Sequence, residues 1–109
     1  MTVTDEPMVR MAEIDVDPAQ LAAYQALLSE EIAASIEREP GVLMLHAVAH
    51  KDAPHAVRIL EVYASRAAYE AHIQTAHFLK YKSATAGMVT ALRLIELDPI
   101  LLAAKPSPA

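Results

Sequence analysis

The chain has 109 residues, of which 54% are hydrophobic and 21% are charged, with a net charge of −5 at pH 7. This length and composition predict one globular domain, and the lack of cysteine excludes disulfides, thiolate nucleophiles and cysteine-based zinc or iron–sulfur sites. The acidic balance without a basic stripe argues against nucleic acid as a partner, and no apolar run approaches the roughly 20 residues of a membrane span. The first residues also lack the basic region of a signal peptide, so we expect a cytoplasmic protein with no membrane partner.

The first two elements are expected to be a strand and a long helix. After a flexible leader over residues 1–7, alternating side chains predict a strand over residues 8–16. Asp17-Pro18 then supplies an N-cap and a proline suited to the first helical turn, and Glu39-Pro40-Gly41 ends the helix. The inward stripe of this helix follows spacings of three and four residues and contains Leu21, Tyr24, Leu28, Ile32 and Ser35.

A pair of strands is expected next, over residues 42–50 and 55–64, joined by a hairpin loop at residues 51–54. Because side chains alternate along a strand, Glu61 and Tyr63 lie side by side on one face. A carboxylate among apolar neighbours would have a raised pKa unless it met a donor such as a histidine.

Two helical stretches and a last strand complete the pattern. Ser65 is expected to cap the first stretch and Thr75 the second, with a break just before Thr75 and an end at Gly87. Residues 88–97 predict the final strand, which is followed by an apolar tail.

The order strand, helix, strand, strand, helix, strand is that of an α+β, ferredoxin-like (βαββαβ) domain, here over residues 8–98. The helices would cover one face of the sheet and leave the other bare. A large uncovered apolar face is rare on a soluble monomer, so we expect a homodimer with two sheets packed face to face. The tail over residues 99–109 is the expected clasp on the partner.

The segment His72-x-x-Thr75-x-His77-Phe78 resembles the H-x-x-T-x-H-F signature of the antibiotic biosynthesis monooxygenase family. This family includes quinol and anthrone oxygenases that work without flavin or metal. The similarity extends over residues 8–97 and implies a dimeric α+β barrel that takes a small apolar or aromatic substrate together with O2.

The preceding strand fits the same family, whose members commonly carry Glu-x-Trp or Glu-x-Tyr before a serine cap, as Glu61, Tyr63 and Ser65 do here. A cofactor-free oxygenase must deprotonate a phenol, quinol or anthrone so that the resulting anion can pass an electron to oxygen, and histidine titrates near working pH. We expect His72 to be the base, with Glu61 and His77 orienting it. The alternative is that one or both histidines only hydrogen-bond backbone at the helix junction. Glu61 would then lie at a solvated strand end or make a hydrogen bond that only stabilises the fold.

Aromatic and methionine side chains are the expected walls of the substrate pocket, although such residues at core spacing often only fill the core. The expected substrate-binding residues are Tyr63, Phe78, Tyr69, Tyr24, Met11 and Met44.

No metal site is expected. His46 and His50 share a strand face but lie about 13 Å apart along it, too far to bind one ion. A trio of His72, His77 and Glu61 would suit iron in principle, but no close ligand motif supports it.

No organic cofactor is expected either. Haem-degrading relatives of the family use an asparagine on the first strand, a tryptophan on the second helix and an axial histidine, and these places hold Ile14, His72 and Lys82 here. With only Gly41 and Gly87, the chain also lacks the glycine-rich loop of flavin and nicotinamide sites.

The first functional hypothesis is therefore a cofactor-independent monooxygenase for a small aromatic quinol, anthrone or polyketide-like phenol. The alternatives are a non-catalytic dimeric barrel that binds a small molecule and a proton-transfer isomerase on the same fold, because fold does not dictate function.

Overall fold

The computed structural model describes residues 6–106, so residues 1–5 of the expected leader and residues 107–109 of the tail lie outside the described part. The strands are β1 (Met8–Val16), β2 (Val42–Ala49), β3 (Ala56–Tyr63) and β4 (Val89–Leu97). They form one sheet in the order β2-β3-β1-β4, and all neighbouring strands are antiparallel.

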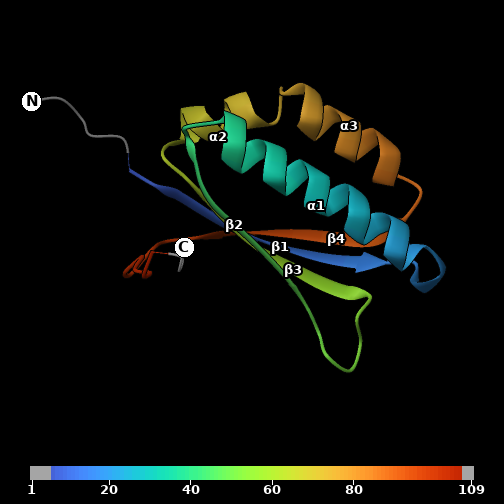
Figure 1. Cartoon of the computed structure of the whole chain (residues 1–109). Helices are drawn as coiled ribbons and strands as arrows, with labels where there is room; N and C mark the ends of the chain where they lie inside the picture. Colours follow the sequence, from blue (N-terminus) through green and yellow to red (C-terminus); the bar gives the residue numbers. More distant parts are fainter. Residues whose placement is uncertain (1–5, 107–109) are drawn as a thin grey trace, which may run out of the picture.

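Three α-helices cover one face of this sheet (Figure 1). They are α1 (Leu21–Arg38), α2 (Arg66–His72) and α3 (Ala76–Thr85). The architecture is the predicted α+β, ferredoxin-like one, and the second helical stretch is divided where the sequence predicts a break. Ser65 caps α2 by accepting a hydrogen bond from the Ala68 N–H at 3.0 Å. Within residues 6–106, no helix combines the length and the apolar character needed to cross a membrane.

The start of α1 differs slightly from the prediction. Asp17 caps a single 3-10 turn (η1, Pro18–Gln20) by accepting a hydrogen bond from the Ala19 N–H at 3.0 Å, and the α-helix proper begins at Leu21. The buried residues of α1 are Tyr24, Leu28, Glu31 and Ser35. The inward stripe therefore contains a carboxylate, Glu31, that the sequence prediction did not include.

A belt of polar residues interrupts the core between the sheet and the helices. Arg10 of β1 and Glu61 of β3 are direct cross-strand partners, and both border the same interior cavity. The apolar core is split into two clusters: one of Ala12, Ile14, Val16, Tyr24, Leu28, Val57, Ile59 and Tyr81, the other of Met8, Val42, Leu45 and Tyr63. Along β1, Met8 belongs to one cluster and Ala12 to the other, so polar side chains gather where apolar packing is broken.

Strand β2 contains a bulge near its start. Val42 pairs with Tyr63 and Leu45 pairs with Glu61, so β2 takes three residue steps where β3 takes two. The extra residue, in the segment 43–44, allows Val42 and Leu45 both to be buried on the helix side.

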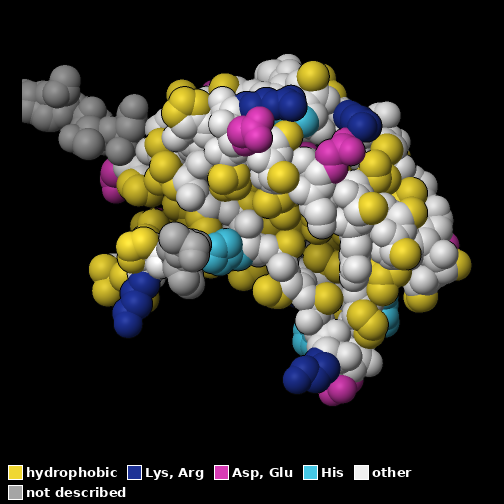
Figure 2. Space-filling view, in the orientation of Figure 1, with side chains coloured by type: hydrophobic (Ala, Val, Ile, Leu, Met, Phe, Trp, Pro, Cys, Tyr) yellow, Lys and Arg dark blue, Asp and Glu magenta, His cyan; other side chains and the backbone are white. Residues whose placement is uncertain are grey.

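Within the described residues 6–106, no helix covers the other face of the sheet (Figure 1). Its apolar end includes Met11, Met44 and Leu60, which are partly exposed, and residues 101–104 of the C-terminal segment approach this end. Figure 2 shows hydrophobic side chains gathered below the helical layer, in the hollow between the C-terminal segment and the β2–β3 hairpin.

Gly41 marks a close approach between the start of β2 and α2. A Cβ atom added at this position would lie 2.6 Å from the Cβ of Ala68, closer than unbonded carbons approach each other. Gly87 has nothing within 4 Å of the equivalent point, and neither glycine has a positive φ. The two glycines therefore form a matched pair for substitution, because a Cβ atom would be crowded at Gly41 and unhindered at Gly87.

We predict that Gly41→Ala lowers the free energy of unfolding by about 1–3 kcal/mol, because an extra methyl group overpacks the contact with α2. Urea denaturation would measure this. Gly87→Ala is the control and should leave stability unchanged or slightly raised. Ala68→Gly in the Gly41→Ala background should restore much of the loss, and a Gly41→Ala protein of unchanged stability would contradict the close approach.

Candidate functional site

Glu39 is the point at which the three helices meet. It is the C-cap residue of α1. Its Oε2 atom accepts hydrogen bonds from Nδ1 of His72 at 2.9 Å and from Nε2 of His77 at 2.5 Å. His72 is the last residue of α2 and His77 the second residue of α3. One carboxylate therefore joins the ends of all three helices.

The break between α2 and α3 brings the two histidines to one point. Thr75 is the N-cap of α3: its Oγ1 accepts a hydrogen bond from the Phe78 N–H at 3.3 Å and donates one to the His72 carbonyl at 2.8 Å. Five residues of continuous helix would place His72 and His77 roughly 140° apart around the axis. The interruption removes that constraint, and the two ring centroids lie 6.3 Å apart.

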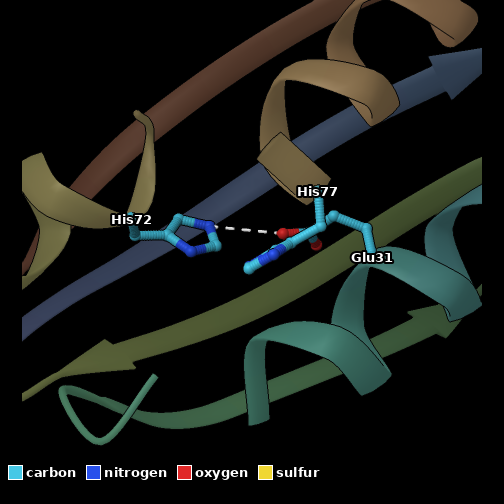
Figure 3. Close-up of side chains that lie close together, drawn as sticks. All are labelled: Glu31, His72 and His77. Atoms are coloured by element: carbon cyan, nitrogen blue, oxygen red, sulfur yellow. Dashed lines mark ion pairs between the residues drawn. The ribbon is translucent and has the colours of Figure 1, made fainter. Parts of the chain in front are cut away.

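A second carboxylate, Glu31 of α1, lies beside Nε2 of His72, and Figure 3 shows the ion pair between the two side chains. Its Oε1 atom is 3.4 Å from Nε2 of His72 and accepts a hydrogen bond from the Ser35 hydroxyl at 2.8 Å. Glu31 and His72 are only 6% and 3% exposed. The imidazole of His72 is thus held between the buried carboxylate of Glu31 and the partly buried carboxylate of Glu39, one beside each nitrogen.

The hydrogen bonds of Glu39 determine which nitrogen of His72 can act as a base. Burial alone would raise the pKa of Glu39, but the hydrogen bonds from His72 and His77 outweigh burial and hold that pKa below its usual range. An ionised carboxylate only accepts hydrogen bonds, so Nδ1 of His72 carries a hydrogen. In the neutral imidazole Nε2 is then the nitrogen that can accept a proton, and a proton there would be beside Glu31.

Glu61, the carboxylate expected to orient the histidines, has a different partner. Its Oε1 atom accepts a hydrogen bond from the Tyr63 hydroxyl at 2.7 Å, and within residues 6–106 no histidine is hydrogen-bonded to it. The sequence prediction is corrected here because Glu61 lies on the sheet, whereas both histidines point to the end of α1. Burial raises the pKa of Glu61, and the Tyr63 hydrogen bond and the nearby Arg10 charge only partly offset this.

Arg10 places a cation beside this carboxylate. Its Nη1 donates a hydrogen bond to the Tyr69 hydroxyl at 2.6 Å, and its Nη2 donates one to Glu96 at 2.5 Å. The guanidinium carbon also lies 4.3 Å from the centre of the Tyr69 ring, a cation–π arrangement. Burial lowers the pKa of Arg10, but these two partners outweigh burial and raise it overall, so Arg10 stays charged.

A cavity of about 100 Å³ lies between the sheet and the helices, and its lining includes Arg10, Glu31, Glu61 and His72. A second hollow of about 220 Å³ continues between α3 and β4, and the two share the lining residues Ile14, Tyr81, Lys82 and Leu92. Leu92 and Leu94 are about half exposed at 47% and 49%, so the cavity opens along β4. A dry cavity of about 150 Å³ is known to bind benzene, so a larger aromatic ligand would extend into the second hollow.

The structure brings only part of the expected pocket wall to this cavity. Three of the expected residues line it, namely Tyr63, Tyr69 and Phe78. Tyr24 lies behind the wall, fully buried, with its hydroxyl 2.6 Å from that of Tyr81. The prediction that Met11 and Met44 form part of the pocket wall is corrected. Side-chain alternation and the β2 bulge place both on the opposite face of the sheet, where Met44 lines the hollow near the C-terminal segment. His77 also stays outside the cavity lining and contacts Glu39 instead.

The sequence reasoning missed Glu31, Glu39 and Tyr81. Glu31 lies three residues after Leu28 and four before Ser35, so helical spacing could have placed it on the inward stripe. Glu39 was interpreted only as a helix end. A carboxylate at a helix C-terminus, where the helix dipole disfavours an anion, is a signal that a hydrogen-bond donor or cation lies nearby.

One group of side chains has the spacing of a metal site. Single ligand atoms of Glu31, His72 and His77 lie within 4.8 Å of one another. The trio considered from the sequence contained Glu61, and the structure has Glu31 in its place. These atoms are already engaged, because His77 Nε2 bonds Glu39 and Glu31 Oε1 accepts from Ser35. A cation bound here would have to replace these hydrogen bonds.

Comparison with known proteins adds an independent finding. The family model of antibiotic biosynthesis monooxygenases matches residues 7–84. A proposed antibiotic biosynthesis monooxygenase from Bacteroides thetaiotaomicron VPI-5482 is 49% identical to this chain, with a TM-score of 0.89 over 94% of this chain and 97% of that chain. A proposed family protein from Caulobacter crescentus CB15 is 24% identical, with a TM-score of 0.83 over 90% and 93% of the two chains, and supports the fold alone. No curated protein matches.

We predict that Glu39→Gln lowers the melting temperature by about 5 °C or more near neutral pH, since the folded state loses the ionised acceptor of both histidines. The pKa of Glu39 is lowered by folding, so its stabilisation is present above the ordinary glutamate pKa and is lost as the pH falls through the folded-state pKa. The difference in melting temperature should therefore shrink below about pH 4. Exposed Glu37→Gln is the control, and an equal deficit at acid and neutral pH would contradict the assignment.

Glu61→Gln should change the melting temperature in the direction opposite to Glu39→Gln. Because burial raises the pKa of Glu61, its ionised form destabilises the folded state above the folded-state pKa, and this cost vanishes below the ordinary glutamate pKa. Glutamine keeps an acceptor for the Tyr63 hydroxyl. We expect a melting temperature equal to or above that of the unsubstituted protein at about pH 8, with the gain fading near pH 4. A clear loss of stability at alkaline pH would show that the charge is not a cost.

Proposed function

The chain belongs to the antibiotic biosynthesis monooxygenase family, and we propose that it is a cofactor-independent monooxygenase that oxidises a small aromatic quinol, anthrone or polyketide-like phenol with O2. One observation supports this most directly. His72 borders an interior cavity, one of its nitrogens is fixed by Glu39, and the other is the nitrogen that can accept a proton. That is the arrangement that a general base requires.

In the proposed reaction, Nε2 of His72 takes the proton from a phenolic hydroxyl of the substrate. Glu39 keeps the hydrogen on Nδ1, and His77 holds Glu39 in place by bonding the same carboxylate oxygen. Glu31, 3.4 Å from Nε2, stabilises the imidazolium that forms. Glu61 then has a separate role, as a cavity carboxylate bonded to Tyr63.

The reaction needs no external reductant. The deprotonated quinol passes one electron to O2, the two radicals combine into a carbon–oxygen bond, and the O–O bond of the resulting peroxide then breaks. One oxygen atom stays on the ring carbon and the other leaves as water, with its protons supplied by the substrate through His72. The four electrons that reduce O2 come from the quinol, which becomes a hydroxyquinone.

A non-catalytic binding protein is the second candidate, and the approach of Glu31 to Nε2 of His72 favours it. If the Glu31 carboxylate remained beside Nε2, that nitrogen would not be free to reach a substrate proton, and the cavity would then only bind a small molecule. A proton-transfer isomerase would use the same base without oxygen.

We predict saturable O2 uptake by chelator-treated protein with naphthohydroquinones or anthrones, above their autoxidation. His72→Ala should reduce kcat by at least about 100-fold, the usual scale of a lost general base. His55→Ala, at an exposed position of the loop between β2 and β3, is the matched control and should leave uptake unchanged.

The other outcomes point to the rival functions. Uptake that appears only after iron is added would assign the Glu31, His72 and His77 group to a metal-dependent reaction. Tight binding of the quinols without uptake would favour a binding protein. Conversion of the substrate into an isomer in the absence of oxygen would favour an isomerase.

We also propose that two copies pair through the bare face of the sheet. The partly exposed apolar side chains of Met11, Met44 and Leu60 supply its centre. The C-terminal segment 101–104, which approaches this end, supplies the clasp expected from the sequence. An apolar face of this kind is stable in water only when it is covered.

We predict that the unsubstituted protein sediments as a dimer at micromolar concentration and that Met11→Glu weakens the dimer at least about tenfold, because pairing would bury a charge. Leu79→Glu, on the exposed surface of α3, is the control and should leave the dimer intact. A monomer at these concentrations would remove the pairing proposal while leaving the site assignment untouched.

A further inference from the structure

Two tyrosines behind the cavity wall share one hydrogen bond. Tyr24 of α1 and Tyr81 of α3 have their hydroxyl oxygens 2.6 Å apart. Tyr24 is 0% exposed and lines neither hollow, whereas Tyr81 lines both of them. The pair therefore connects the sealed core with the space where a ligand would lie.

The two hydroxyl hydrogens of this pair bear on which tyrosine donates the shared hydrogen bond. Burial raises the pKa of both hydroxyls, so each keeps its proton near neutral pH. Two hydrogens are present, but only one can lie between the two oxygens. Within residues 6–106, neither hydroxyl has another hydrogen-bond partner. A buried donor without an acceptor is costly, and Tyr24 lines neither hollow, so the arrangement in which Tyr24 donates to Tyr81 is favoured when the cavity holds an acceptor. In this arrangement the Tyr81 hydrogen is available to a ligand in the cavity.

The surroundings of Tyr81 suit an oxygen-bearing aromatic ligand. Ile14 and Leu92 provide apolar walls on both hollows, and Lys82 contributes a cation to the same lining. Phe78 links this region to the base, with ring centroids 5.1 Å from His72 and 6.4 Å from Tyr81. A donor and a cation beside apolar walls favour an oxygen that carries negative charge.

We propose that the Tyr81 hydroxyl, oriented by Tyr24, binds the phenolate oxygen of the substrate. The chain of donors from Tyr24 to Tyr81 to the substrate polarises each hydrogen bond and strengthens it. The inference rests on the proposed function for the identity of the ligand as a phenol. It adds a residue that holds the deprotonated substrate, whereas His72 removes the proton.

Binding of 4-nitrophenol tests this without any turnover, because its phenolate has a visible absorption band and it is not a quinol. The unsubstituted protein should bind nitrophenolate and lower the apparent pKa of the bound phenol. Tyr81→Phe should weaken nitrophenolate binding by about tenfold or more, the scale of a hydrogen bond to a charged group. The affinity for 4-nitroanisole, the methyl ether of the same compound, which cannot ionise, should change by less than about twofold.

Two further variants separate the hydrogen bond from a loss of structure. The double variant Tyr24→Phe with Tyr81→Phe leaves no hydroxyl unpaired, so it should fold normally and show the same loss of nitrophenolate binding as Tyr81→Phe. Tyr24→Phe alone keeps the Tyr81 donor and should lose less affinity than either. Thermal unfolding of each variant checks that the fold is retained.

The results would overturn the inference in three ways. These are no nitrophenolate binding by the unsubstituted protein, equal nitrophenolate affinity with and without the Tyr81 hydroxyl, and equal weakening of nitrophenolate and nitroanisole. The oxygen-uptake experiment stands apart from all three. Protein that binds nitrophenolate through Tyr81 but consumes no oxygen would sink the monooxygenase proposal alone, and uptake unaffected by Tyr81→Phe would sink the present inference alone.

Discussion

The helical layer of this protein depends on one partly buried carboxylate, Glu39, at the end of α1. A helix C-terminus disfavours an anion, yet Glu39 is ionised there because two histidines donate to it. Helices as short as α2 and α3 are marginal on their own, so their ends need such a link. The contact that fixes the helices is also the contact that fixes the tautomer of His72. Fold and candidate chemistry are therefore built on the same three side chains.

The polar groups inside the domain destabilise the folded state, and apolar packing must offset this. Arg10, Glu31 and Glu61 are charged or ionisable groups inside the domain, and a buried charge is seldom a net gain in stability. Each has its own partner: Arg10 bonds Tyr69 and Glu96, while the carboxylates bond Ser35 and Tyr63. Two separate apolar clusters enclose the belt. A carboxyl group whose pKa burial raises at the edge of a cavity, as for Glu61, is more typical of a functional site than of a structural core.

Local patterns were enough to predict most of the fold, because caps and alternation involve neighbouring residues. The two strands of the hairpin and the helix break before Thr75 lie within one or two residues of their predicted places. The partner of His72 could not be predicted in this way, since Glu39 is 33 residues away and meets it only when α1 docks beside α2. Met11 and Met44 were misplaced for a related reason. Alternation divides a strand into two faces but does not tell which face the helices will cover.

The bulge in β2 has a consequence for the length of the chain between helix and sheet. Residues 40–44 connect Glu39 to Leu45, which lies opposite Glu61, and one of them is the extra residue of the bulge. Deleting it would shorten the connection by up to about 3.3 Å, which is comparable with a hydrogen bond. Either Glu39 would be pulled from the histidines, or β2 would slip and turn its side chains over. The number of residues in this connection thus fixes the position of the Glu39 carboxylate. This short segment should therefore tolerate substitutions far better than insertions or deletions.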